Sequence, residues 1–152
     1  MKNLIFLCCL ASITLVSCNK KVYRFTDESL AGQWSCNRIE YQASWVNNKF
    51  ADYVQTSNVT KGQLIFKYEN NQLFALKNSQ WIKGSILTEY NNLPIVEDDG
   101  RSIRIKNEYL ENQTKNTVNL VEEHTYLIKD TRYNKLNSKS KLVIACIKIA
   151  SK

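Results

Sequence analysis

Short segments of alternating apolar and polar residues, separated by turn-forming residues, fill the chain from about Gln33 onward. A period of two is typical of half-buried β-strands, whereas an amphipathic helix repeats every 3.6 residues. The chain shows no long helical stripe, so we expect an all-β fold. The expected strands are 33–41, 64–68, 73–77, 81–90, 102–109, 117–122, 125–129 and 142–149, with 43–54 as a further strand or a short helix.

The pair Asn70-Asn71 marks the clearest turn. Asparagine tolerates positive φ, as a tight β-hairpin requires, and alternating segments flank the pair on both sides. The sequence therefore predicts a hairpin of 64–68 with 73–77. In that register one face carries Leu64, Phe66, Tyr68, Leu73 and Ala75.

About eight short strands in a chain of 152 residues favour one domain. We expect a single antiparallel β-barrel of about eight strands, with a sandwich as the other common architecture. Turn-rich pieces separate the strands at Asn91-Asn92, Asp98-Asp99-Gly100, 112–116 and 134–140, and Pro94 lies in one of these breaks.

The N-terminus has the parts of a secretory signal: Lys2, an apolar stretch over 4–16 and small residues after it. The stretch is shorter than the roughly 20 residues of a transmembrane helix. Its end, Leu15-Val16-Ser17-Cys18, resembles a bacterial lipobox. The resemblance implies a removed signal peptide (1–17), a tether lipidated on Cys18 (18–28) and a barrel domain (29–152). A plain signal peptide cut elsewhere and a short anchor helix are the alternatives.

The residues after Cys18 bear on location. Asn19, where inner-membrane retention uses aspartate, resembles lipoproteins sent to the outer membrane. The basic pair Lys20-Lys21 suits anionic headgroups and differs from the acidic run that resembles a surface-export signal in Bacteroidetes. We expect a lipid-anchored outer-membrane protein that faces the periplasm, with the cell surface as the alternative.

The chain is basic, with 21 Lys and Arg against 14 Asp and Glu. Loss of the signal removes only Lys2 from this balance. Basic proteins bind nucleic acid, acidic partners or anionic membranes. An exported lipoprotein rarely meets nucleic acid, and the longest basic run is Lys20-Lys21, so we expect no nucleic-acid partner.

Two cysteines, Cys36 and Cys146, remain besides the lipidation candidate once the signal is gone. Disulfides persist in an export compartment, so these cysteines could join the first and last strands of a closed barrel. Two buried free thiols are the alternative. The cysteine spacing and the single histidine match no metal site.

The segment Leu30-Ala31-Gly32-Gln33-Trp34 resembles the opening of calycin-type barrels: lipocalins, lipocalin-like lipoproteins and avidins. The resemblance implies structural roles for Gly32, where the backbone turns, and for Trp34, which plugs the barrel floor. The same residues resemble small periplasmic metalloprotease inhibitors, whose segment before the barrel enters the protease cleft. Here that segment would be 18–28, and both its lipid and the cysteine spacing depart from the inhibitor pattern.

Residues suited to catalysis are few. Glu122, His124 and Tyr126 share a strand face only if one strand runs through them, and we expect a hairpin tip at 122–124 instead. The histidine belongs to no serine or cysteine motif, and Asp98-Asp99-Gly100 lacks the ligand alternation of a calcium loop. We expect no catalytic residue, no metal, no cofactor and no enzyme activity.

Aromatic residues are the best binding candidates, although most suit the core. We select Trp45, Tyr53, Trp81 and Tyr90 for ligand or partner binding. Two functions remain open. A lipocalin-like module would bind an apolar small molecule or envelope component in an apolar cavity. A protein-binding inhibitor, of a secreted protease or as a toxin-immunity lipoprotein, would have a filled interior and an aromatic rim.

Overall fold

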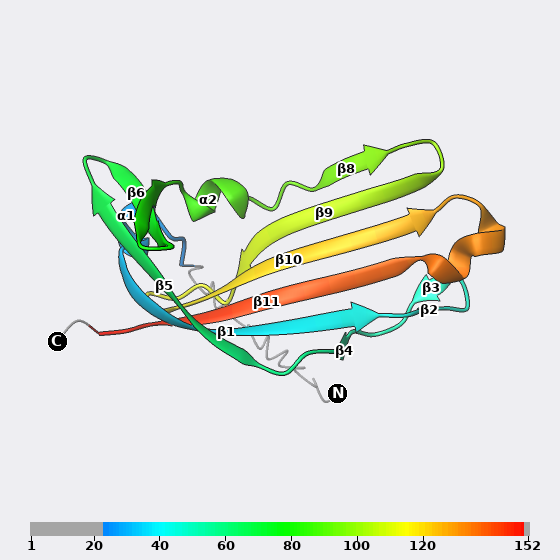
Figure 1. Ribbon diagram of the computed structural model, residues 1–152, viewed down its shortest axis with the longest axis horizontal. Helices are drawn as coiled ribbons and strands as arrows, with labels where there is room; N and C mark the ends of the chain where they lie inside the picture. The colour runs from blue at the N-terminus through cyan, green and yellow to red at the C-terminus, as the bar shows by residue number, and fades with distance from the viewer. Residues whose placement is uncertain (1–22, 151–152) are drawn as a thin grey trace, which may run out of the picture.

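The computed structural model describes residues 23–150. One nine-stranded antiparallel sheet dominates it, in the order β7-β6-β5-β1-β11-β10-β9-β8, with β4 paired to β1 (Figure 1). The long strands are β1 (Gly32–Ala43), β5 (Thr60–Glu69), β9 (Ser102–Glu111), β10 (Thr117–Ile128) and β11 (Ser138–Lys148). The short ones are β4 (Val54–Gln55), β6 (Gln72–Lys77), β7 (Gln80–Lys83) and β8 (Ile95–Asp98), while β2 (Trp45–Val46) and β3 (Lys49–Phe50) form a separate hairpin.

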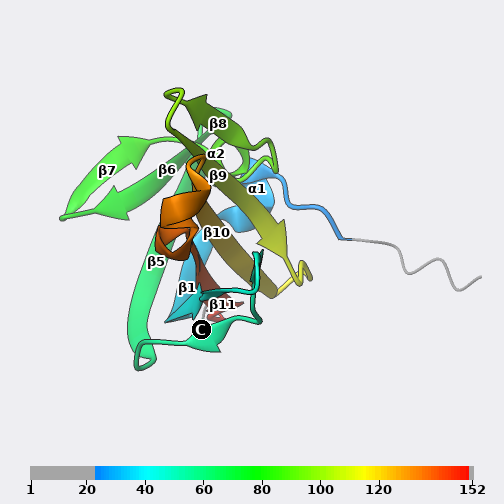
Figure 2. The same cartoon turned by 90° about the vertical axis from the view of Figure 1, so that its right-hand side faces the viewer.

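The antiparallel all-β prediction is confirmed, but the sheet is not closed into a barrel. The strands β1 and β11 do pair, from Trp34 opposite Lys148 to Ala43 opposite Lys139. Their pairing lies in the middle of the sheet, because β5, β6 and β7 extend it on one side and β10, β9 and β8 on the other. Closure would require β7 to pair with β8, and these two strands are the sheet's ends. Figure 2 shows a curved, twisted sheet.

The hairpin around Asn70 and Asn71 is confirmed. Both residues have positive φ, 52° and 59°, and they join β5 to β6. Phe66 lies opposite Ala75, and Tyr68 lies opposite Leu73. The predicted face is the buried one, since Phe66 and Leu73 are both in the core.

Other segments differ from the prediction. The expected strand over 81–90 ends at Lys83, and the helix α2 (Ile86–Glu89) follows, capped by the Ser85 hydroxyl, which accepts from the Leu87 backbone N–H. The expected turn over 134–140 overlaps the end of the 3-10 helix η1 (Thr131–Leu136) and the start of β11. Segment 43–54 forms the β2–β3 hairpin and the loop that reaches β4. The sequence did not predict the strand β8, because Pro94 before it and Asp98-Asp99-Gly100 at its end are typical of turns.

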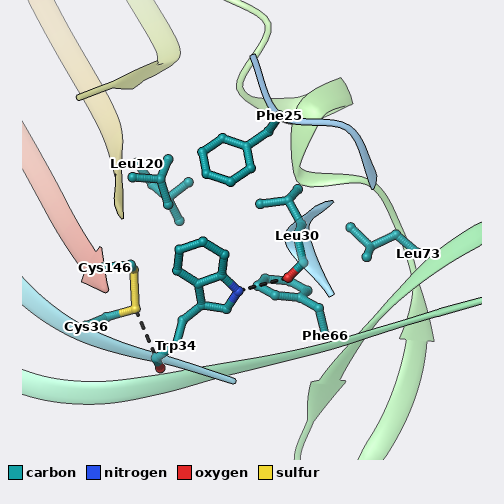
Figure 3. Close-up of a cluster of buried hydrophobic side chains, with 9 residues drawn as sticks. Phe25, Leu30, Trp34, Cys36, Phe66, Leu73, Leu120 and Cys146 are labelled. Carbon is teal, nitrogen blue, oxygen red and sulfur yellow. Dashed lines mark hydrogen bonds between the residues drawn. A yellow bond between two sulfur atoms is a disulfide. The ribbon is translucent and has the colours of Figure 1, made fainter. Parts of the chain in front are cut away.

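The hydrophobic core covers one end of the sheet face that carries Trp34, which we call the inner face (Figure 3). The helix α1 (Asp27–Leu30) packs there through Leu30, and its N-terminus has a capping box between Thr26 and Ser29. Phe25 is also buried there, although the sequence assigned it to the tether. The buried cluster is Phe25, Leu30, Trp34, Cys36, Phe66, Leu73, Val118, Leu120 and Cys146.

Trp34 is at the centre of this cluster and is only 1% exposed. Its indole Nε1–H donates to the carbonyl oxygen of Leu30 at 2.8 Å, and the Phe25 ring meets it edge-on. Gly32 has φ +124°, and a Cβ there would lie 3.0 Å from Cε of Lys148. Both observations agree with a structural role for this segment.

Cys36 and Cys146 are register partners on β1 and β11, and their sulfur atoms are bonded. The disulfide spans 110 residues of sequence and lies within the buried cluster. It therefore joins the central strand pair of an open sheet, whereas the sequence had suggested a barrel seam.

Candidate functional site

The chain's only histidine, His124, lies on β10, which is one unbroken strand. The expected hairpin tip at 122–124 is therefore wrong, and Glu122, His124 and Tyr126 do share the inner face. The strand continues through these polar residues because β9 and β11 pair with it on both sides and satisfy its backbone. Polar side chains alone had suggested a turn.

The register places polar side chains in rows across the inner face. His124 lies between Lys106 of β9 and Ser140 of β11, and Tyr126 lies between Arg104 and Ser138. On the other side of His124, Glu122 lies between Glu108 and Leu142. The next row is apolar, with Leu120 between Leu110 and Ile144. The inner face thus changes from core to polar surface along each strand.

The polar rows line an open hollow of about 420 Å³. A second hollow of about 320 Å³ adjoins it at His124 and Ser140 and extends toward β1. We call the two together the polar groove. Its first part is lined by Ile95, Glu97, Arg104, Lys106, His124, Tyr126, Ser138 and Ser140, and its second part adds Arg38, Glu40, Gln42 and Glu122.

Two cations on β9 dominate the first part of the groove. The Arg104 guanidinium lies 5.7 Å from the centre of the Tyr126 ring and 3.8 Å from Asp99. Lys106 makes a 2.9 Å ion pair with Glu108, which raises the pKa of Lys106. The side chain of Arg104 is 57% exposed and that of Lys106 is 42% exposed. These ion pairs are therefore weak, and the cations are accessible to a ligand.

Tyr90, which follows α2, lies between the core and the groove. It packs against the buried cluster, and its hydroxyl donates a 2.6 Å hydrogen bond to Oε1 of Glu122. Burial and the carboxylate of Glu122 both raise the pKa of Tyr90, so the phenol stays protonated and keeps the bond.

The structure does not bring the other selected aromatics together with Tyr90. The Trp45 ring packs edge-on against Phe50 in the β2–β3 hairpin. Tyr53 donates to Glu123 on the opposite, outer face of the sheet. Trp81 is 43% exposed on β7, beside Lys67. The β2–β3 hairpin and the β6 strand that pairs with β7 lie at opposite ends of the molecule (Figure 1).

The groove offers hydroxyl groups, cations and carboxylates without a metal centre. Within residues 23–150, no group of three or more His, Cys, Asp and Glu side chains could hold a metal ion. In the same range, no helix is long and apolar enough to cross a membrane. Cys18 and the lipobox around it lie outside the described residues. The groove's chemistry suits recognition of a polar surface.

Sequence reasoning missed Arg104, Lys106, Ser138 and Ser140 as site residues. A signal was present, because Arg104, Lys106 and Glu108 alternate within one expected strand. What was lacking was the register, which places this strand beside His124 and depends on pairing between distant segments.

Comparison with known proteins gave no match: no protein-family model, curated protein or solved structure is similar to this chain. Its function is therefore inferred from its own residues.

Proposed function

We propose that this chain is a lipid-anchored envelope protein that binds another protein through the polar groove and catalyses no reaction. One observation carries the proposal: the apolar half of the inner face is filled by the chain's own side chains, whereas the polar half is open. Trp34 and Leu30 are 1% and 2% exposed. The open half is lined by Arg104, Lys106 and His124.

The filled apolar half and the open polar half of the inner face together favour a protein partner over an apolar small molecule. Pockets for small apolar ligands are mostly lined by hydrophobic side chains and enclose the ligand. The groove is open, and charged and hydroxyl-bearing side chains line it beside the apolar Ile95 and Ile105. Protein interfaces tolerate such polarity, and arginine and tyrosine are enriched in them. Arg104, whose guanidinium lies 5.7 Å from the Tyr126 ring centre, and Tyr126 provide both residue types in the lining of the first hollow.

An inhibitor of a secreted protease and a toxin-immunity lipoprotein are both protein-binding functions of this kind. The groove is a better candidate for the contact than the N-terminal segment. Phe25 is 7% exposed and α1 packs on the core, so residues 25–30 are not free to enter a protease cleft. In this proposal Cys18 carries the lipid and holds the domain at the outer membrane, facing the periplasm.

Site-specific photocrosslinking in the cells that produce the protein would test the proposal. The full-length chain would carry benzoylphenylalanine in place of Ser140 in the groove. The matched control would place it at Ile147, on the same strand but facing the outer side and 62% exposed.

We expect Ser140 to give a discrete protein adduct that the Ile147 position does not give. The double substitution Arg104→Ser and Lys106→Ser should abolish that adduct without lowering the melting temperature, because both side chains are largely exposed. Adducts to lipid alone, or identical adducts from both positions, would contradict a protein-binding groove.

A further inference from the structure

The strand β8 forms one wall of the polar groove and ends the sheet. Within the part of the chain that the structure describes, its only strand neighbour is β9, with Ile95 opposite Lys106 and Glu97 opposite Arg104. The backbone N–H of Asp99 donates to the carbonyl of Ser102, which fixes the phase of the antiparallel ladder. Since hydrogen-bonded and non-hydrogen-bonded pairs alternate, the backbone groups of Ile95 and Glu97 point toward β9, and those of Val96 and Asp98 point away from the sheet.

The side chains beside this free edge are unusually apolar. Leu93, Ile95 and Val96 are 69%, 56% and 59% exposed. Proteins commonly protect an edge strand with lysine, proline or a covering loop, because unpaired N–H and C=O groups template pairing with another chain. Here Pro94 protects the approach to β8, and the strand has Glu97 and Asp98 as its charged residues but no lysine. Among residues 23–150, no strand pairs with the outer edge of β8 at Val96 and Asp98.

The surroundings of the edge favour an acidic occupant. On the groove side, two cations of β9, Arg104 and Lys106, outnumber the one carboxylate of the edge strand beside them, Glu97. The strand's other carboxylate, Asp98, is paired with Lys129 at 2.7 Å. Without Lys2, which leaves with the proposed signal peptide, the chain has 20 Lys and Arg against 14 Asp and Glu, a formal charge of +6 that attracts acidic partners over a distance. The other edge strand, β7, carries the exposed Trp81 and Ile82 but does not line the polar groove.

We propose that β8 is extended by a strand from the partner protein, and that acidic side chains of this segment bind Arg104 and Lys106. The proposal rests on the protein-binding function above and specifies how the partner binds. Strand addition of this type gains affinity from main-chain hydrogen bonds and specificity from alternate side chains. Residues of the added strand opposite Ile95 and Glu97 would face the groove, and those opposite Val96 would face out.

The test uses a phage-displayed library of random ten-residue peptides against the full mature chain. We expect enriched peptides that alternate apolar and other residues and that contain Asp or Glu. Val96→Pro removes one outward N–H without touching the ladder to β9, since proline is tolerated where the N–H faces solvent. It should weaken binding at least tenfold. Val96→Thr keeps the donor and the branched side chain and should bind like the native chain.

Two further readouts separate strand addition from simple charge attraction. The amide protons of Val96 and Asp98 should exchange slowly in the peptide complex and fast in the free protein. The resonances of His124, the only histidine, should shift when peptide binds beside the groove. Lys106→Glu should weaken binding, most strongly at low salt.

The two proposals fail in different ways. If Ser140 still crosslinks to a protein in cells while Val96→Pro binds peptides as the native chain does, strand addition is wrong and the groove function stands. If the purified chain dimerises through β8, so that Val96→Pro makes it monomeric, the edge is occupied by a second copy and the partner-strand proposal is overturned. Absence of a crosslinked protein overturns both.

Discussion

The hydroxyl of Tyr90 donates a 2.6 Å hydrogen bond to Oε1 of Glu122 and thereby joins the segment after α2 to the middle of β10. The bond lies where the core gives way to the polar groove, so it couples the stability of the fold to the position of the groove's floor. Hydrogen bonds to charged groups typically contribute about 1.5–3 kcal/mol.

This contact predicts a dependence on alkaline pH. The pKa of Tyr90 is raised above its ordinary value near 10, so the native state holds the proton more tightly than the unfolded chain. The contribution is therefore fully present below about pH 10 and is lost as the pH rises toward the folded pKa. Tyr90→Phe should lower the unfolding free energy by about 1–3 kcal/mol at pH 7 and flatten the decline above pH 10.

Urea denaturation between pH 7 and 11 would measure this effect. Tyr133→Phe is the matched control, because Tyr133 is 51% exposed. A native-like alkaline decline in Tyr90→Phe would mean that other groups, such as Tyr53, whose pKa is also raised, cause the loss.

Trp34 should matter for stability far more than Trp81. Truncation of a buried tryptophan typically costs about 3–5 kcal/mol, a large share of a small domain's roughly 5–15. Trp34→Ala also leaves the Leu30 carbonyl without its donor. We expect Trp34→Ala to unfold or strongly destabilise the domain and Trp81→Ala to change its melting temperature little. Thermal melts of both variants check this, and a native-like Trp34→Ala would refute the structural role.

The bond between Cys36 and Cys146 should stabilise the domain by roughly 4 kcal/mol in the chain-entropy model, because it closes a long loop across 110 residues. Reduction, or the double substitution to Ala, should lower the denaturation midpoint in urea. Quantitative thiol labelling of the unfolded, non-reduced mature chain should find neither cysteine reactive. Labelling of both would contradict the bond.

The N-terminal resemblance predicts lipid on Cys18. Cys18→Ala should move the protein from the membrane fraction to the soluble fraction and abolish labelling by radioactive palmitate in cells. Ser17→Ala keeps a small residue before the cut and should be processed normally. A Cys18→Ala protein that stays membrane-bound would rule out anchoring by this lipid.

Local patterns in the sequence predicted much of the sheet. The period of two located β1, β9 and β11 to within a few residues, and Asn70-Asn71 predicted the hairpin because two residues of positive φ fix its geometry. The failures have physical causes too. Polar residues at 122–124 suggested a turn, yet pairing on both sides of β10 keeps them in a strand.

The groove could not be predicted from local pattern. His124 acquires Lys106 and Ser140 as neighbours only through register with two other strands. Nor could the sequence show that the sheet is open and not closed into a barrel. The β1–β11 pairing suggested by the two cysteines exists, but strand alternation does not tell how many strands continue beyond that pair on each side.

The central disulfide also affects how the domain would survive a protease. Every loop between β1 and β11 falls inside the interval from Cys36 to Cys146, including the exposed hairpin tips at 78–79 and 99–101, which are the kind of site that proteases cleave. A single cut in any of them leaves two fragments that are still covalently joined at the centre of the sheet. A nicked molecule would therefore keep both fragments joined by the disulfide and could refold without losing either fragment by diffusion.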